Sequence, residues 1–353
     1  MIKKLKIAQI APVEETIPPK KYGGVELVVY SLAEGLRKRG HQVYLFGAGE
    51  TKSKAKYFPL FPKAIREYSK FRDVSIREAM KNVATGQVID YLLNLNADII
   101  HNHAGVRFLP FSVIFKKTPF ITTIHGPLDL PTERNKAYLY NRFKNLPYVS
   151  ISFAQRKPMP QLNYAANIYH GIDICKYQFS KKGGNYLSFL ARIAPEKGPV
   201  EAILIAKTTG IKLKIAAKVD PLRQDFYEKE VKPLIDGKQI QFLGEVSHRR
   251  KVELLKNSLA LLAPIKWREP FGLFLTEAMA CGTPVIVFDQ GSAREVVKDG
   301  KTGFVVKDIE EAVGAVKKIK EIKREDCRKW VEENFTVEKM VQDYEKLFYR
   351  LLK

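Results

Sequence analysis

Residues 267–297 read WREPFGLFLTEAMACGTPVIVFDQGSAREVV, and the fold prediction starts from them. Glu269 stands before a predicted helix, Leu273–Ala280, and Glu277 lies inside it, in an E-x7-E spacing. An apolar run at Pro284–Phe288 follows and predicts a buried strand. The N-terminal end of a helix presents backbone N–H groups to polar ligands, and carboxylates accept hydrogen bonds from paired hydroxyls. The stretch therefore predicts a ligand site beside an α/β sheet.

Strand-like apolar runs alternate with helix-length amphipathic segments on both sides of this stretch. This alternation is typical of βαβ units with a parallel sheet. Between the first two runs, apolar residues at helical spacing predict a helix that ends near Gly40. The predicted strands are Leu5–Ala11, Gln42–Phe46, Asp98–His101, Phe120–Ile124, Tyr148–Ser150, Tyr186–Leu190, Leu213–Ala216, Gln239–Leu243, Leu259–Leu262 and Pro284–Phe288.

The 353 residues suit two domains of ordinary size, and the two halves resemble one another in layout. The break is expected around Gly171–Gly184, where Lys-Lys-Gly-Gly precedes a new strand. We predict domains over 1–170 and 171–335, and a final segment, 336–353, whose helix (Thr336–Leu352) packs back on the first domain. The predicted fold class is α/β, with two Rossmann-like doubly wound parallel sheets facing a central cleft at the carboxyl ends of their strands.

Several motifs together resemble the family 4 retaining glycosyltransferases of the two-Rossmann (GT-B) architecture, and the resemblance covers essentially the whole chain. Each motif alone would be modest, whereas their combination is specific. At Ala191 many relatives carry glycine, which is a small departure. The motifs are YGGVE from Tyr22, TTIHGPLD from Thr122, HGID from His170, RIAPEKG from Arg192, FLGEVS from Phe242 and the two glutamates of the opening stretch.

The resemblance implies that Glu277 grips the ribose of a nucleotide and that Glu269 contacts the transferred sugar. The backbone N–H groups of Phe271, Gly272 and Leu273 would point at sugar hydroxyls or phosphate. The alternative interpretation is that the two glutamates have no function and are solvated side chains near an ordinary helix cap.

Arg192 and Lys197 follow the predicted strand Tyr186–Leu190 in a loop that enters a helix, Pro199–Thr209. Departure of a nucleoside diphosphate builds negative charge, which two cations and a helix N-terminus would stabilise. The resemblance assigns this phosphate role to Arg192 and Lys197.

Four further groups complete the implied site. Gly23 and Gly24 open the first helix and would let the backbone approach a diphosphate. His125 follows a strand and would lie beside the donor sugar, positioning or polarising it. The resemblance also implies backbone contacts to the nucleobase from residues after two strands of the second half, Lys218, Val219, Gly244, Glu245 and Val246; uracil and guanine stay equally open.

His101 and His103 alternate along a strand and could face the same way, as metal ligands sometimes do. The chain contains no Asp-x-Asp, however, and the GT-B architecture generally manages without metal. We therefore expect no metal and no cofactor. His170 falls at the hinge between the halves and is interpreted as structural.

The formal net charge of +22 attracts anions, but it does not distinguish phosphates from acidic lipids or nucleic acid. Adaptation to high temperature could equally produce such an excess of basic residues. No recognised nucleic-acid module occurs, so nucleic acid is not expected as a partner. Three scattered cysteines without metal spacing and the lack of a long apolar run favour a cytoplasmic protein, with contact to the inner face of the membrane left open.

Residues 52–72, KSKAKYFPLFPKAIREYSKFR, mix basic and aromatic side chains. Three interpretations stay open: aromatics that pack on the N-terminal core, contact with an anionic membrane, or a cleft for an anionic acceptor. The expected function is retaining sugar transfer from a nucleotide sugar to an unidentified acceptor. A UDP-sugar is favoured as the donor over a GDP-sugar, and an anionic or lipid-linked acceptor stays open. The alternatives are a nucleotide-sugar epimerase or hydrolase on the same fold, or a catalytically idle nucleotide- or membrane-binding protein.

Overall fold

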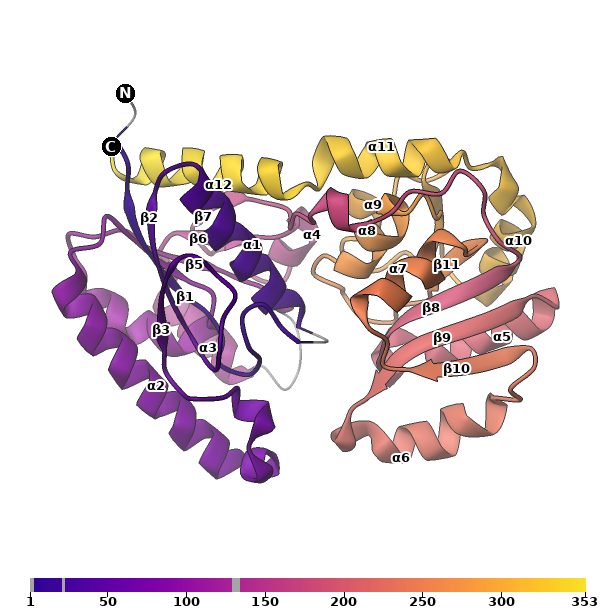
Figure 1. Cartoon of the computed structure of the whole chain (residues 1–353), viewed down its shortest axis with the longest axis horizontal. Coiled ribbons are helices and arrows are strands. Elements are labelled where there is room, and N and C mark those ends of the chain that lie inside the picture. The colour runs from indigo at the N-terminus through magenta and orange to yellow at the C-terminus, as the bar shows by residue number, and fades with distance from the viewer. Residues whose placement is uncertain (1–2, 21–22, 129–133) are drawn as a thin grey trace. The chain divides into compact units, whose positions relative to one another are not determined.

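The computed structural model describes residues 3–20, 23–128 and 134–353, and it divides the chain into two compact units. Unit 1 contains residues 1–171 and 337–353, and unit 2 contains residues 172–336 (Figure 1). The chain therefore passes from unit 1 into unit 2 between Gly171 and Ile172 and returns between Thr336 and Val337. The N-terminal domain predicted from the sequence ends one residue earlier, at position 170.

Unit 1 is built on a seven-stranded parallel sheet in the order β3-β2-β1-β4-β5-β6-β7. The order runs outward in both directions from β1, which is the doubly wound pattern predicted from the sequence. The strands are β1 (Lys6–Ile10), β2 (Gln42–Gly47), β3 (Lys56–Pro59), β4 (Ile99–Asn102), β5 (Phe120–Thr123), β6 (Tyr148–Ser150) and β7 (Tyr164–Asn167).

The α-helices of unit 1 are α1 (Gly24–Lys38), α2 (Val74–Leu95), α3 (Arg134–Arg142), α4 (Phe153–Arg156) and α12 (Val337–Leu351), and a 3₁₀ segment, Gly105–Ile114, lies between β4 and β5. Asp73 caps α2 because its side chain accepts hydrogen bonds from the N–H groups of Ser75 and Ile76. Buried side chains of β1, β2 and β4 form one core with α2.

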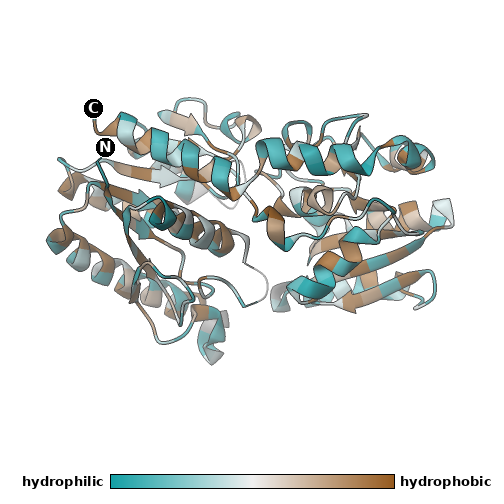
Figure 2. Cartoon of the chain, turned by 45° about the horizontal axis from the view of Figure 1, so that its top comes forward, coloured by the Kyte–Doolittle hydropathy of each residue, from teal (hydrophilic) through white to brown (hydrophobic). Residues whose placement is uncertain are grey.

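The last helix, α12, packs on unit 1 and lies beside α1 (Figure 1). Its buried residues recur every three or four positions and form one face: Met340, Val341, Tyr344, Leu347 and Phe348. The opposite face is mostly hydrophilic, as the helix beside the C-terminus in Figure 2 shows.

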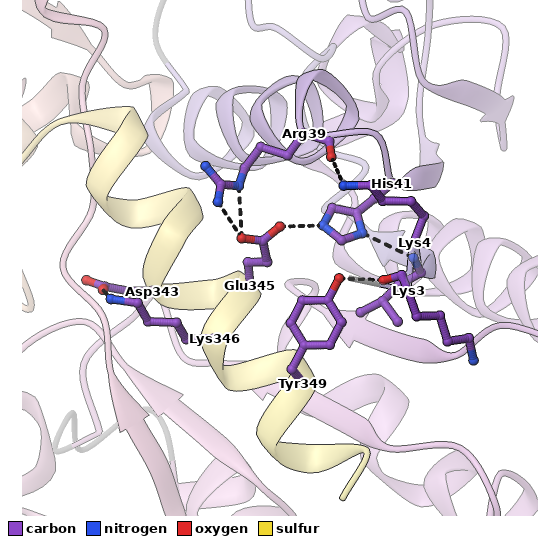
Figure 3. A network of polar contacts seen from close by, with 9 residues as sticks. Lys3, Lys4, Arg39, His41, Asp343, Glu345, Lys346 and Tyr349 are labelled. Atoms are coloured by element: carbon purple, nitrogen blue, oxygen red, sulfur yellow. Dashed lines mark hydrogen bonds and ion pairs between the residues drawn. The ribbon is translucent and has the colours of Figure 1, made fainter. Parts of the chain in front are cut away.

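Polar contacts fix α12 at the N-terminal edge of the sheet (Figure 3). Glu345 accepts hydrogen bonds from Arg39 Nε at 2.9 Å and Nη2 at 2.6 Å, and its other oxygen lies 2.8 Å from His41 Nε2. Since the Leu5 N–H donates to Nδ1 of the same imidazole, Nε2 carries the proton and donates to Glu345. Tyr349 donates its hydroxyl to the carbonyl of Lys3.

Unit 2 is built on a six-stranded parallel sheet in the order β10-β9-β8-β11-β12-β13. The strands are β8 (Tyr186–Ile193), β9 (Lys212–Val219), β10 (Ile240–Gly244), β11 (Ala260–Ala263), β12 (Val285–Phe288) and β13 (Gly303–Val306). The α-helices are α5 (Pro199–Thr209), α6 (Gln224–Phe226), α7 (His248–Lys256), α8 (Leu273–Ala280), α9 (Ala293–Val296), α10 (Ile309–Lys318) and α11 (Arg324–Asn334). The two parallel sheets confirm the predicted α/β class with two Rossmann-like domains.

Each of the ten predicted strands is present, with its ends shifted by at most three residues. Three strands were not predicted: β3, β7 and β13. All three lie at sheet edges, where a strand is short and only partly covered, so its hydrophobic pattern is weak. Among the described residues, no helix is both long and apolar enough to span a membrane.

The basic-aromatic segment 52–72 contains β3 and packs at the sheet edge. Phe58 stacks on Phe46 with ring centroids 5.1 Å apart and also contacts Tyr91. Phe61 packs against the same core, whereas Lys52, Lys54 and Lys56 are exposed. Packing of aromatics on the N-terminal core, the first of the three interpretations, therefore holds for Phe58 and Phe61. The exposed lysines leave membrane contact and binding of an anionic acceptor untested.

Candidate functional site

The loop before α8 holds Glu269 through contacts with the segment after β12. The N–H of Ser292 donates to the carbonyl of Glu269 at 3.0 Å, and the Ser292 hydroxyl donates to the carbonyl of Phe271 at 2.9 Å. A Cβ on Gly291 would stand 2.3 Å from the Glu269 carbonyl oxygen, so only glycine fits there. Gly272 caps α8 with a φ of 83°, in the left-handed region that glycine favours. The α8 N-terminus that the sequence predicts is thus built from these two loops.

Lys197 and Glu269 form a largely buried ion pair. Trp267 Nε1 also donates to Glu269, at 2.9 Å, and the Lys197 ammonium lies 4.7 Å from the centroid of the Trp267 ring. Only 6% of Lys197 is exposed, so its charge is balanced by Glu269 and by the aromatic face. The structure therefore brings together two residues that the sequence predicts for the phosphate and the sugar.

Glu277 belongs to a separate cluster of polar side chains, and the sequence did not reveal its other members. The carboxylate is paired with Lys251 of α7, and Tyr177 donates its hydroxyl to it at 2.7 Å. Burial and the neighbouring carboxylate raise the pKa of Tyr177, so its hydroxyl remains a donor. Glu269 and Glu277 thus have different partners, which agrees with the prediction that they need not share a target.

Arg192 lies in β8 and not in the loop after it, so the predicted strand end at Leu190 is wrong. The strand extends because β8 pairs with β9 as far as Ile193, which lies opposite Val219. In this register Arg192 stands opposite Lys218. Like charges on directly opposite residues repel each other, and an anion bound between them would relieve that repulsion.

The predicted nucleobase contacts lie at the carboxyl ends of β9 and β10. Lys218 and Val219 are inside β9, not after it, because the pairing with β8 continues through both residues. Gly244 is the last residue of β10, and Glu245 and Val246 follow it directly. All of these positions are on the edge of the sheet where a doubly wound fold binds ligands.

In unit 1, Gly23 is the N-cap of α1 and Gly24 is its first residue, after β1 as predicted. Tyr22 and Asp129, which belong to the two motifs of this half, lie outside the described residues. Glu26, in the first turn of α1, is buried, and burial together with the charges of Glu14 and Glu15 raises its pKa to about 7.

His125 follows β5 and is joined to two other histidines. Its Nε2 lies 2.9 Å from His103 Nδ1, and its Nδ1 lies 3.3 Å from His170 Nε2. Burial lowers the pKa of His125 to about 3 and lowers the pKa values of His103 and His170 well below the usual range, so all three imidazoles are neutral.

Each histidine of the pair proposed as a metal alternative has one ring nitrogen in a side-chain hydrogen bond, whereas His101 Nδ1 and His103 Nε2 are buried without a partner among the described residues. The rings of His101 and His103 are 3.9 Å apart between centroids, and His101 Nε2 lies 2.7 Å from the Thr123 hydroxyl. Within the described part of the chain, no group of three or more His, Cys, Asp or Glu side chains is arranged to hold a metal ion.

Sequence reasoning missed Lys251 and Tyr177, and it named His103 and His170 without relating either of them to His125. Lys251 lies on an amphipathic helix with other basic residues, and Tyr177 lies in a loop, so neither has a distinctive local pattern. HGID did draw attention to His170, but only as a hinge residue.

Two family models match the chain. The model "Glycosyl transferases group 1" matches residues 174–336, and "Glycosyltransferase Family 4" matches residues 22–160. Among curated proteins, the chain is 25% identical to N-acetyl-alpha-D-glucosaminyl L-malate synthase of Bacillus anthracis, over 94% of this chain and 95% of that protein. It is 24% identical to phosphatidyl-myo-inositol mannosyltransferase of Mycolicibacterium smegmatis, over 86% of this chain and 81% of the relative.

Solved structures share the fold over nearly the whole length. Sucrose-phosphate synthase from Thermosynechococcus elongatus has a TM-score of 0.80 at 17% identity, with 99% of both chains covered. HepE of Anabaena, solved in complex with UDP and glucose, has a TM-score of 0.74 at 18% identity, covering 98% of this chain and 100% of that one. With the two family models and the two doubly wound sheets, these likenesses show that the chain is a glycosyltransferase and belongs to family 4 of the GT-B architecture.

Proposed function

We propose that the chain transfers a sugar from a nucleotide sugar to an acceptor with retention of the anomeric configuration. The observation that carries the proposal is the arrangement in unit 2. There Lys197 and Glu269 are paired beside the N-terminus of α8, and Arg192 and Lys218 stand opposite each other at the carboxyl end of β8 and β9.

These groups fit a diphosphate that leaves with negative charge. Fixed cations and helix N–H groups that face developing charge lower the barrier without reorganising during the reaction. Lys197 is held in place by Glu269 and Trp267 before any donor binds, so it is preorganised. Arg192 is partly exposed, and its Nη2 lies 3.9 Å from a carboxylate oxygen of Glu196. We assign both cations to the leaving diphosphate.

Glu277 fits the ribose, because a carboxylate fixed by Lys251 and Tyr177 still has lone pairs for two hydroxyls. Glu269 fits the transferred sugar, and we propose that its pairing with Lys197 suits it to bind hydroxyls and not to attack carbon. Retention would then follow from attack on the front face, with the leaving diphosphate helping to deprotonate the acceptor.

The donor is expected to be a UDP-sugar, with a GDP-sugar as the alternative. The solved complexes of HepE with UDP, with UDP-glucose and with UDP and glucose support a uridine nucleotide. We also propose that neither a metal nor a cofactor takes part, since the chain has no Asp-x-Asp.

A panel of labelled UDP- and GDP-sugars, incubated with a library of acceptors and with EDTA, tests the proposal. Label in a new glycoside whose anomeric proton shows the donor's configuration would support it. Free sugar alone would indicate a hydrolase, an altered sugar nucleotide an epimerase, and no turnover of any donor an idle binding protein. Activity that EDTA abolishes and Mg²⁺ or Mn²⁺ restores would overturn the metal-independent mechanism.

The acceptor stays open between soluble and lipid-linked molecules, because the two curated relatives are named for L-malate and for phosphatidyl-myo-inositol. Sedimentation with anionic vesicles separates these cases. Binding that weakens with salt, and falls when the exposed residues Lys52, Lys54 and Lys56 become Glu, favours a membrane-bound acceptor. Absence of binding at low salt favours a soluble acceptor.

A further inference from the structure

Tyr177 contacts three helices of unit 2, α7, α8 and α11, and each helix holds a different part of it (Figure 1). Its hydroxyl donates to Oε1 of Glu277 in α8 at 2.7 Å. Its ring lies edge-on to the ring of His248 in α7, with centroids 5.2 Å apart. Its carbonyl accepts a hydrogen bond from Nη1 of Arg328 in α11 at 2.7 Å. Since Tyr177 is only 4% exposed, these contacts decide where its hydroxyl lies.

The contacts of Arg328 close a ring around this cluster. The same Nη1, which carries two N–H groups, also donates to the carbonyl of Ala280, the last residue of α8, at 2.9 Å. Ala280 is three residues after Glu277 in that helix. A path therefore runs from the Tyr177 hydroxyl through Glu277 and α8 to Ala280, and from there through Arg328 to the Tyr177 carbonyl. Both ends of Tyr177 are thus fixed relative to the helix that carries the carboxylate.

The two side-chain donors to Glu277 bind the same carboxylate oxygen. Lys251 and Tyr177 each donate to Oε1. Within the part of the chain that the structure describes, no group donates a hydrogen bond to Oε2. Oε2 is therefore the oxygen with the greater capacity to accept from a ligand, and its direction depends on the two donors that hold Oε1.

We propose that Arg328 is a positioning residue for Glu277, because it holds Tyr177 so that the carboxylate keeps one orientation for the nucleotide. The inference rests on the proposed function, in which Glu277 binds the ribose. A binding group contributes most when its orientation is set before the ligand arrives. The two bonds of Arg328 to this cluster go to backbone carbonyls, so its effect reaches Glu277 through Tyr177.

A second arginine of α11 holds the ends of α7 and α8 together. Arg324, one turn before Arg328, donates to the carbonyls of Lys256 at 2.8 Å and Cys281 at 3.5 Å, at the C-terminal ends of these two helices. It also donates to the carbonyl of Ser258 at 2.9 Å. A cation is stabilising at a helix C-terminus. The two helix ends therefore stay joined without Arg328, and unit 2 is expected to fold when Arg328 is replaced.

The test removes the Nη1 contacts of Arg328 in the full-length chain. Arg328→Met loses both carbonyl bonds. Arg328→Gln ends at the level of Nε, so it also loses them but keeps a polar group beside Glu332, and it serves as the second variant if Arg328→Met does not fold. Arg328→Lys keeps a cation that can donate to a carbonyl. Lys329→Met is the matched control, since Lys329 is exposed and pairs with Glu333 on the surface.

Calorimetric titration with UDP, and in parallel with GDP, measures the Kd of the nucleotide, and steady-state kinetics gives kcat and the donor KM. We expect Arg328→Met and Arg328→Gln to raise Kd and KM by roughly tenfold with little change in kcat, because a ribose contact is the same in the ground and transition states. Arg328→Lys should recover most of the affinity. Lys329→Met should match the wild type.

The same titration in a Tyr177→Phe background distinguishes positioning from a merely structural role. If Arg328 acts through the Tyr177 hydroxyl, Arg328→Met should raise Kd by less than about twofold once that hydroxyl is absent. An increase as large as in the wild-type background would overturn the positioning role, because independent effects add. Wild-type affinity in the folded Arg328→Met and Arg328→Gln variants would also overturn it.

Melting temperatures without nucleotide separate this inference from the proposed function. Tyr177→Phe should lower Tm by about 2–4 °C in the wild type and by less than about 1 °C in Arg328→Met, where the hydroxyl is no longer held on Glu277. Equal decreases in both backgrounds would contradict the inference. If the wild type bound neither UDP nor GDP, the proposed function would fail, and this comparison would still decide whether Arg328 holds Tyr177 on Glu277.

Discussion

Lys197 and Arg192 differ in how they are held, although both are assigned to the leaving diphosphate. Lys197 is almost buried and is paired with Glu269, whereas Arg192 is partly exposed at a strand end. Both Lys197→Ala and Arg192→Ala should lower kcat more than tenfold, because losing one donor to developing charge typically costs about 3 kcal/mol. Steady-state kinetics with circular dichroism of the folded variants checks this, and Lys207→Ala on α5 is a control cation. Near-normal rates in both variants would remove the phosphate assignment.

Glu277 and Glu269 should differ in the kinetic parameter they affect. Glu277→Ala should mainly raise the donor KM, because contacts with a ribose change little between the ground and transition states. Lys251→Ala should resemble Glu277→Ala, since Lys251 pairs with that carboxylate. Glu269→Ala should instead lower kcat. Initial rates over a range of donor concentrations distinguish the cases, and the same change of KM and kcat in all three variants would contradict separate roles.

Glu26 makes the stability of unit 1 depend on pH. Its pKa is about 7 in the folded chain, above the ordinary value of 4.5, because burial disfavours the charged form. The folded state therefore binds more protons between these values, and the free energy of unfolding falls as the pH rises through them. Between pH 5 and 8 the wild type should lose about 2–3 kcal/mol relative to Glu26→Gln.

Thermal unfolding of both proteins across this pH range measures the difference. Glu34 on the same helix is the matched control: although burial opposes it, hydrogen bonds from Ser53 and the Lys54 N–H lower its pKa. The stabilisation that the lowered pKa of Glu34 provides is lost only below pH 4.5. Glu34→Gln should therefore not change how the free energy of unfolding varies between pH 5 and 8. Parallel curves for Glu26→Gln and wild type would show that Glu26 ionises normally.

At the scale of elements, the attachment of α12 depends on Glu345. Glu345→Ala should destabilise unit 1 by about 1–2 kcal/mol, because it leaves Arg39 and the buried His41 without their carboxylate partner. The melting temperature should fall by about 3–6 °C. Asp343→Ala on the same helix is the control, since its contacts with Lys339 and Lys346 are on the surface and worth less than about 1 kcal/mol. Equal effects of the two substitutions in calorimetry would show that the buried contacts add nothing.

Sequence patterns identify the central elements of both sheets and fail at their edges. β12 is a continuous apolar run because parallel strands are covered on both faces, and β1 lies in the mostly apolar stretch Leu5–Ala11. β3 ends in proline and β7 is Tyr-Ala-Ala-Asn, so neither has such a run, and β13 has only Phe-Val-Val after its first glycine. Sequence patterns also place Arg192 in the loop after β8 and not inside the strand. Only the register with β9 shows that β8 continues to Ile193.

At the scale of the whole molecule, motifs locate the site residues, but their partners depend on the folded chain. Lys197 and Glu269 are 72 positions apart, and Lys251 and Glu277 are 26 apart. The sequence predicts Lys197 and Glu269 separately and cannot show that they are paired. Lys251 has no motif of its own and is recognised only through Glu277.

The path of the chain makes unit 1 depend on residues that follow unit 2 in the sequence. α12 belongs to unit 1 although unit 2 precedes it in the sequence. It buries Met340, Val341, Tyr344, Leu347 and Phe348, each worth about 1.5–3 kcal/mol. Their sum is comparable with the whole stability of a typical protein, about 5–15 kcal/mol. Removing residues 337–353 should therefore unfold unit 1 and leave unit 2, whose residues 172–336 are all retained, folded.

Hydrogen exchange measured by mass spectrometry resolves the two units in one experiment. In the shortened chain, amides of β1, β2 and β4 should lose protection, while amides of β8, β11 and β12 should keep it. Removing only Leu352 and Lys353, which are exposed, is the matched control and should leave both units protected. If β1, β2 and β4 stayed protected without α12, the rest of unit 1 would be stable by itself, and the last helix would serve some purpose other than completing the core.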